Sequence, residues 1–264
     1  MMLSFGNLKV RYDDLLETET TSADTIVRQA LSGRIAPELI YDYPENWLRV
    51  AADSHYRHAD ACVEALKTLL RDPRWNEIAG SIGSLIDLGV GAGSKLARFV
   101  ADIGSRRANL AVLMIDRSGE LIVAASEALA AVKHATGSDF TAYGARSDFY
   151  DLRRTLGREA ARDIRAPGHG RAAVLLLGGT IGNVEEDRML AGISGATQRG
   201  DLLIVSLEFA STPDGAQGGE EMCESYRSAA INELCIAPFR APAGFPGSSR
   251  DGPRRAGPSG LLLA

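Results

Sequence analysis

The chain has 264 residues, 45% of them hydrophobic, which is enough for one well-buried domain with a smaller appendage. A formal net charge of −5 and a pI near 5.5 exclude the basic surface that nucleic-acid binding needs. No apolar run approaches the ~20 residues that cross a bilayer, and the N-terminal segment turns acidic before any apolar stretch, so we expect neither a membrane span nor a secretory signal.

The cysteines and histidines do not form a metal-binding pattern. Cys62, Cys223 and Cys235 are scattered and odd in number, which fits free thiols in a reducing cytoplasm better than a disulfide framework. His55 and His58 can share one face of a helix, but no cysteine or third histidine lies near them, so an exposed pair is the simpler interpretation. We therefore expect a cytoplasmic protein without a metal site.

The first 80 residues predict a helical region. Residues 22–33, SADTIVRQALSG, begin with a serine N-cap, carry apolar residues at helical spacing and end in glycine. After an aromatic connector with two prolines, residues 54–72 place apolar side chains on one helix face. We assign residues 1–80 to an N-terminal helical region that contributes to a substrate site.

From residue 83 onward, short apolar segments alternate with helical ones. This alternation is typical of a parallel sheet covered on both faces. Because crossovers between parallel strands are right-handed, the arrangement is a doubly wound, Rossmann-like α/β sheet, which we place in residues 81–236. The expected strands are residues 84–89, 109–116, 139–145, 172–179 and 201–209, with helices at 94–104 and 118–135.

The segment LIDLGVGAGSKLARF, residues 85–99, is an apolar strand that passes through three glycines into a helix. Ligands of doubly wound sheets bind beyond the carboxyl ends of the strands. Gly89, Gly91 and Gly93 let the backbone turn tightly and approach a ligand without a Cβ clash. This glycine loop (residues 89–93) therefore predicts a site for a nucleotide-like cofactor.

Polar and aromatic residues follow the next two expected strands at the same edge. Asp116 ends the second strand, where a carboxylate can accept hydrogen bonds from both hydroxyls of a ribose. Asp148 and Phe149 follow the third strand and offer an acceptor and an aromatic face to an adenine. We expect all three to contact the cofactor.

The glycine spacing distinguishes the cofactors that use such a turn. A dinucleotide fingerprint needs glycine or alanine where Ser94 stands, whereas the third glycine here, Gly93, comes one place earlier. Asp87 precedes the loop, and a carboxylate there suits a ligand with an ammonium and a sulfonium but would repel a pyrophosphate. The pattern favours S-adenosylmethionine over NAD, and an NAD-dependent oxidoreductase is the less favoured alternative.

A second motif, LLLGGTIGNVEEDR at residues 175–188, leaves the fourth expected strand and enters a helix. Together with DLGVGAGSKLARF, it resembles the histidine-specific methyltransferase family, whose best-known members methylate the α-amine of histidine in ergothioneine synthesis. The resemblance covers residues 41 to 230. It implies a Rossmann-like methyltransferase sheet, and an S-adenosylmethionine-dependent N-methyltransferase that acts on histidine or a related small amino acid.

The resemblance also implies which residues bind the cofactor. Gly89, Lys95, Asp116, Asp148 and Phe149 fall where the family holds S-adenosylmethionine. Lys95 lies just inside a helix, where its ammonium can pair with the carboxylate of the cofactor. An exposed helix lysine is the alternative interpretation.

Substrate-binding residues are implied in the same way. Asn183, in GGTIGN, falls where the family binds its amino-acid substrate, although an asparagine there can also cap the following helix. Tyr226, in ESYRSAA, matches a substrate-contacting tyrosine, with core packing as its alternative role. Tyr56 is the candidate for an N-terminal tyrosine of the site, and Tyr41 competes with it.

The last stretch, residues 237–264, holds five of the ten prolines, no lysine or glutamate, and no periodicity. This composition is typical of a disordered, low-complexity tail. The resemblance implies two further strands and a histidine-recognising insertion that this stretch does not match. A truncated, non-catalytic S-adenosylmethionine-binding protein therefore remains an alternative function.

Overall fold

The computed structural model describes residues 1–16, 44–53, 58–158, 164, 166, 169–178, 180, 184–207 and 227–236. Seven strands within these ranges form one sheet in the order β1-β2-β5-β4-β3-β6-β7. All neighbouring strands from β2 to β7 are parallel, which confirms the predicted doubly wound α/β sheet. The strands are β1 (Met2–Phe5), β2 (Leu8–Asp14), β3 (Ile82–Leu88), β4 (Leu110–Asp116), β5 (Phe140–Arg146), β6 (Arg171–Leu176) and β7 (Leu202–Val205).

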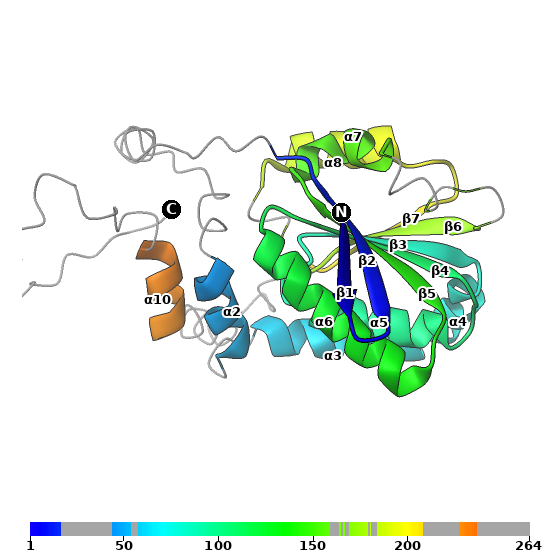
Figure 1. Cartoon of the computed structure of the whole chain (residues 1–264), viewed down its shortest axis with the longest axis horizontal. Helices are drawn as coiled ribbons and strands as arrows, with labels where there is room; N and C mark the ends of the chain where they lie inside the picture. The colour runs from blue at the N-terminus through cyan, green and yellow to red at the C-terminus, as the bar shows by residue number, and fades with distance from the viewer. Residues whose placement is uncertain are drawn as a thin grey trace, which may run out of the picture.

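Helices cover both faces of the sheet (Figure 1). On one face lie α3 (His58–Arg71), α4 (Pro73–Ala79), α5 (Ser94–Gly104) and α6 (Gly119–Thr136). On the other lie a 3₁₀ turn, η2 (Phe149–Asp151), α7 (Leu152–Leu156) and α8 (Glu186–Ala196). Every residue of β3 and β4 is buried, as expected for central parallel strands with helices on both sides.

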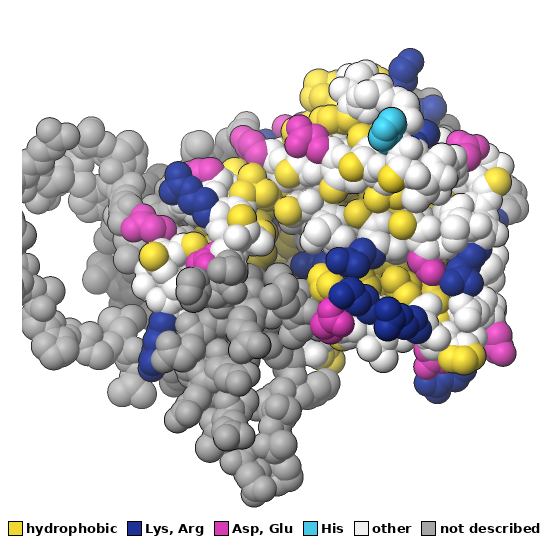
Figure 2. Space-filling view, turned by 90° about the horizontal axis from the view of Figure 1, so that it is seen from below, with side chains coloured by type: hydrophobic (Ala, Val, Ile, Leu, Met, Phe, Trp, Pro, Cys, Tyr) yellow, Lys and Arg dark blue, Asp and Glu magenta, His cyan; other side chains and the backbone are white. Residues whose placement is uncertain are grey.

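The face that carries α3 to α6 is mixed in charge. Figure 2 shows Lys and Arg side chains gathered in a short row near the middle of this face, with Asp and Glu side chains beside it. Among the described residues, Lys67 pairs with Glu64 within α3, and Arg106, just after α5, pairs with Asp102. Exposed pairs of this kind add little stability, but they reduce the local excess of positive charge.

The first residues of the chain form a hairpin rather than a helix, so the predicted helical character of residues 1–80 is wrong for this part. β1 pairs antiparallel with β2, and β2 pairs parallel with β5, so the hairpin extends the sheet at its β5 edge. Leu8, Val10 and Tyr12 are buried while their neighbours are more exposed, a period-two pattern. The turn contains Gly6 at φ 55°, a conformation that favours glycine.

Two helices lie beyond the carboxyl ends of the parallel strands (Figure 1). These are α2 (Pro44–Ala52) and α10 (Ala229–Ile236), which pack against each other through Val50, Ile231 and Leu234. We call them the α2–α10 pair. The predicted helix at residues 22–33 and the predicted tail at 237–264 lie outside the described residues.

Candidate active site

The glycine loop follows the buried strand β3 and leads into α5. Gly89, Gly91 and Gly93 all have positive φ, at 77°, 54° and 77°, which side chains other than glycine rarely adopt. Their surroundings differ. A Cβ on Gly93 would lie 2.6 Å from the Cα of Ala125 in α6, so this third glycine lets α5 and α6 approach each other.

Asp116 ends β4 beside this loop, as predicted. Its Oδ2 accepts a hydrogen bond from the backbone N–H of Gly91 at 3.1 Å, and its Oδ1 accepts one from Ser118 at 3.0 Å. Burial raises the pKa of Asp116 to about 6, against the opposing effect of these backbone donors. Each carboxylate oxygen can accept a second bond, so Asp116 can still receive a donor from a ligand.

Asp87 lies near the end of β3, in register with Met114 of β4 and two residues before the level of Asp116. Its side chain is buried, and its Oδ1 has no hydrogen-bond partner among the described residues. Burial raises the pKa of Asp87 to about 7, although the nearby Lys95 ammonium acts in the opposite direction. A buried carboxylate oxygen without a donor is costly, so this atom is suited to a ligand that brings a donor or a positive charge.

The two sequence motifs meet at this edge. A Cβ on Gly89, in the glycine loop, would lie 3.1 Å from the side chain of Thr180, which belongs to GGTIGN. The ammonium of Lys95, at the start of α5, lies against Gly178 and leaves no room there for a Cβ. Lys95 is half-buried rather than fully exposed. Thr180 is a site residue that sequence analysis did not identify.

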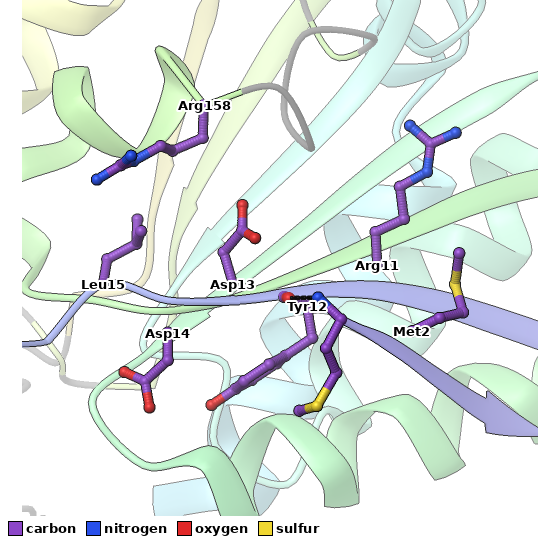
Figure 3. Close-up of a pocket in the computed structure, with 8 residues that line it drawn as sticks. Met2, Arg11, Tyr12, Asp13, Asp14, Leu15 and Arg158 are labelled. Atoms are coloured by element: carbon purple, nitrogen blue, oxygen red, sulfur yellow. Dashed lines mark hydrogen bonds between the residues drawn. The ribbon is translucent and has the colours of Figure 1, made fainter.

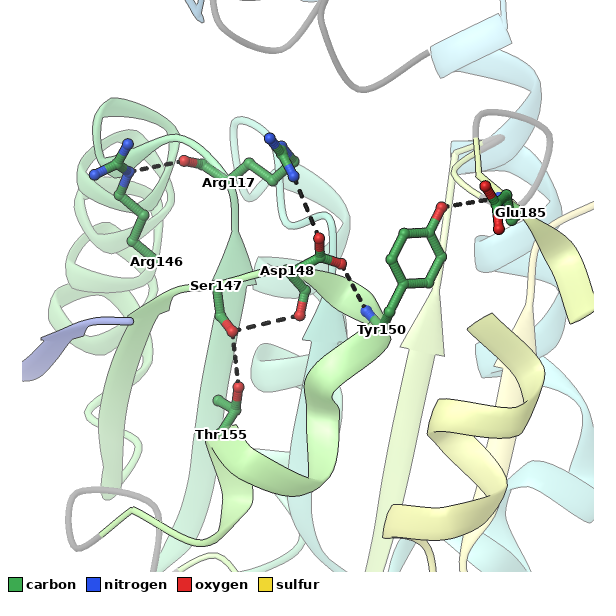
Figure 4. Close-up of polar contacts among 7 residues, drawn as sticks. All are labelled: Arg117, Arg146, Ser147, Asp148, Tyr150, Thr155 and Glu185. Carbon is green, nitrogen blue, oxygen red and sulfur yellow. Dashed lines mark hydrogen bonds and ion pairs between the residues drawn. The ribbon is translucent and has the colours of Figure 1, made fainter. Parts of the chain in front are cut away.

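Asp148 follows β5 and is already engaged by the protein (Figure 4). Its Oδ1 accepts from the backbone N–H of Tyr150 at 2.9 Å and so caps η2, while its Oδ2 lies 3.4 Å from Nη1 of Arg117. Arg117 follows Asp116 directly, and its buried Nε has no partner among the described residues. No local motif indicates a pair between residues 31 positions apart, so Arg117 is not among the predicted site residues.

Phe149 contacts the glycine loop, and Tyr150 contacts the residue that precedes α8. Phe149 is buried in the core on the α7–α8 face, and its ring tip lies 3.5 Å from the position of a Cβ on Gly89. The hydroxyl of Tyr150 accepts from the backbone N–H of Glu185 at 2.9 Å, just before α8 (Figure 4). Phe149 thus backs the glycine loop, with most of its ring surface already covered by protein.

Three predicted substrate residues, Asn183, Tyr226 and Tyr56, lie outside the described residues, as does the competing Tyr41. Asn183 is nevertheless bracketed in the sequence by Thr180 and Glu185, which the structure places close to the glycine loop and to Tyr150. The described residues of this motif, Gly178 and Thr180, lie beside Lys95 and the glycine loop.

A separate hollow of about 760 Å³ lies along the N-terminal hairpin. Figure 3 shows Arg11 and Asp13 on one side of β2, with Arg158 above it, and Tyr12 and Asp14 on the other side. None of the predicted cofactor residues lines this hollow. Across the described part of the chain, no group of three His, Cys, Asp or Glu side chains could hold a metal ion, and no helix is long and apolar enough to cross a membrane.

A parallel sheet with a glycine loop after one strand and a buried acid at the end of the next defines a protein that binds a nucleoside-containing cofactor. A family model for histidine-specific, S-adenosylmethionine-dependent methyltransferases matches residues 60–228. The chain belongs to this family and is a methyltransferase that uses S-adenosylmethionine. A search of the curated proteins found no match.

The residues at the site fit this cofactor. The unpartnered Oδ1 of Asp87 and the half-buried ammonium of Lys95 offer opposite charges to the two ends of a zwitterionic amino-acid group. Gly89 and Gly91 have backbone conformations in which side chains would be strained, so the turn on which the cofactor would lie depends on glycine.

Proposed function

We propose that the protein transfers a methyl group from S-adenosylmethionine to the α-amine of histidine or a closely related amino acid. The observation that carries this proposal is the contact between the two family motifs, Gly89 against Thr180 and Lys95 against Gly178, beside the unpartnered Asp87. It supports a single site at the carboxyl edge of the sheet, in which cofactor and substrate lie side by side.

The cofactor supplies a methyl carbon already activated by the positive sulfonium to which it is bonded. We assign Asp87 to the ammonium of the cofactor, Lys95 to its carboxylate and Asp116 to its ribose. Gly89, Gly91 and Gly93 shape the loop on which it lies, and Asp148 accepts from its adenine. Phe149 holds this loop from behind.

The protein's remaining task is to present a neutral amine in line with the methyl group. Proximity and orientation supply most of the rate enhancement in such a displacement, so no metal or covalent nucleophile is required. We assign Asn183 and Tyr226 to the amino acid's carboxylate and amine, and Tyr56 to its side chain. The amine loses a proton as it becomes methylated, and a tyrosine oxygen or water can accept it.

The test is methyl transfer from radiolabelled S-adenosylmethionine to free amino acids, to total RNA and to protein. We expect labelled histidine, identified by mass spectrometry as carrying the methyl group on the α-nitrogen. Nα-acetylhistidine is the matched control, because it retains the imidazole but blocks the α-amine. Label on Nα-acetylhistidine would indicate ring methylation, and label on RNA or protein with inert amino acids would overturn the proposed substrate class.

We further propose a small-molecule substrate and a cytoplasmic location. The described surface mixes charges of both signs, which supports a small-molecule substrate rather than a polyanion (Figure 2). Cys62 and Cys235 are free thiols, and this supports the expected cytoplasmic location.

A further inference from the structure

A tryptophan from the N-terminal region lies against the middle of the glycine loop. A Cβ placed on Gly91 would be 3.2 Å from Nε1 of Trp47, so the N–H edge of the indole sits directly beside this glycine. Trp47 belongs to α2, more than forty residues earlier in the chain. Gly91 is also the residue whose N–H binds Asp116, so Trp47 contacts the part of the loop that is tied to the predicted ribose-binding acid.

The opposite side of Trp47 is anchored in the α2–α10 pair. Its ring packs with Ala230 against the small cluster of Val50, Ile231 and Leu234. Trp47 is half-buried, whereas Val50 is fully buried and Leu234 nearly so. One aromatic side chain therefore joins a helical pair, built from both ends of the described chain, to the cofactor loop.

We infer that Trp47 is a positioning residue for the cofactor: it makes the α2–α10 pair one wall of the site and holds Gly91 in its binding conformation. An indole edge in contact with a loop at positive φ limits the conformations that the loop can adopt before the ligand arrives. Preorganisation of this kind increases affinity, because less ordering is left to occur on binding. The inference rests on the assignment of the cofactor to the glycine loop.

The chain offers its own optical test, because it contains two tryptophans. Trp75 lies in α4, is buried, and donates its indole N–H to Asp102 in α5 at 2.9 Å. In the variant Trp47→Phe, Trp75 remains as the only tryptophan and serves as the internal control. We expect saturating S-adenosylhomocysteine to change the emission of the unmodified protein and to leave that of Trp47→Phe unchanged.

Affinities measured by calorimetry distinguish a role of Trp47 in positioning Gly91 from a role only in packing the α2–α10 pair. We expect Trp47→Ala to weaken S-adenosylhomocysteine binding about tenfold, equivalent to ~1.4 kcal/mol, and Trp47→Phe to weaken it less because the ring is retained. Val50→Ala is the matched control, since it loosens the α2–α10 pair without touching Gly91. It should lower the melting temperature and weaken S-adenosylhomocysteine binding clearly less than Trp47→Ala does.

The possible failures are distinguishable. If Val50→Ala weakens binding as much as Trp47→Ala, or if both proteins show the same emission change, Trp47 acts only through packing and the inference is wrong. If the unmodified protein binds no S-adenosylhomocysteine in the calorimeter, the cofactor assignment itself fails, and the inference fails with it.

Discussion

The backbone N–H of Gly91 donates to Oδ2 of Asp116 at 3.1 Å, which ties the middle of the glycine loop to the end of the neighbouring strand. The other oxygen of the same carboxylate accepts from Ser118, the N-cap of α6. One buried acid therefore fixes two turns at once, and both turns face the predicted cofactor site.

Asp116→Ala should weaken S-adenosylhomocysteine binding by about 2–3 kcal/mol, because hydrogen bonds to charged groups are the stronger kind. The stability of the ligand-free protein should change little, since the lost backbone bonds are offset by removal of a buried charge. Calorimetry and thermal unfolding measure the two effects separately. Unchanged affinity with a large fall in melting temperature would show that Asp116 is only structural.

Asp87 predicts a pH dependence of stability. Burial raises its pKa from the ordinary 3.8 to about 7, so the folded state retains a proton that the unfolded state loses between these values. The contribution of Asp87 to the free energy of unfolding is therefore most favourable below pH 4 and is lost as the pH rises to about 7. Asparagine does not ionise, so Asp87→Asn removes this decrease in stability with rising pH.

We therefore expect Asp87→Asn to match the original protein near pH 4 and to be more stable at pH 8, by a few kcal/mol at most, since one pKa unit corresponds to ~1.4 kcal/mol. Urea unfolding at both pH values measures the difference in the free energy of unfolding between the variant and the original protein. The same variant should bind S-adenosylmethionine more weakly at pH 8, because the charge that faces the ammonium is gone. A stability difference that does not increase from pH 4 to pH 8 would contradict the prediction.

We expect Asp148 to accept a hydrogen bond from the exocyclic amine of the adenine. Asp148→Ala is expected to weaken S-adenosylhomocysteine binding about tenfold, whereas S-inosylhomocysteine, which lacks that amine, should bind both proteins alike. Because Asp148 also caps η2, a general loosening of this turn is the competing explanation. A loosened turn would weaken the binding of both ligands equally. The ratio of the two dissociation constants, compared between Asp148→Ala and the original protein, therefore distinguishes the two explanations.

Gly93→Ala should destabilise the protein by about 3 kcal/mol, through a left-handed backbone and a clash with Ala125. Gly137→Ala is the matched control, because Gly137 also has a positive φ, 66°, but has open space around it. The difference between the two unfolding free energies isolates the contact between α5 and α6. Equal losses would mean that the backbone conformation alone demands glycine at residue 93.

The sheet could be predicted because its signals are local. Each strand from β3 to β7 is a short apolar run next to a turn or helix signal, and each overlaps an expected strand. The hairpin carries local signals too, in the alternation of β2 and in the Gly6–Asn7 turn. It was missed because its strands are short and precede a region with a helical pattern.

The site could be predicted only in part. Asp87 lies near the end of β3 and Asp116 ends the adjacent parallel strand β4, so their proximity follows from topology. The contacts of Trp47 with Gly91 and of Arg117 with Asp148 depend on how distant segments pack, and no spacing in the sequence encodes them. The contact of Lys95 with Gly178 likewise joins two separate motifs, and no spacing in the sequence indicates it.

The parallel pairing of β2 with β5 has a consequence for the order of folding. Asp14 and Arg146, which pair at 3.1 Å, are separated by 132 positions, so β2 has no strand to join until β5 has been synthesised. During synthesis the hairpin must therefore wait, while β3 and β4 can pair as soon as the helix between them has emerged. Closing so long a loop is entropically costly, and this makes the hairpin a late addition to a sheet nucleated around the cofactor strands.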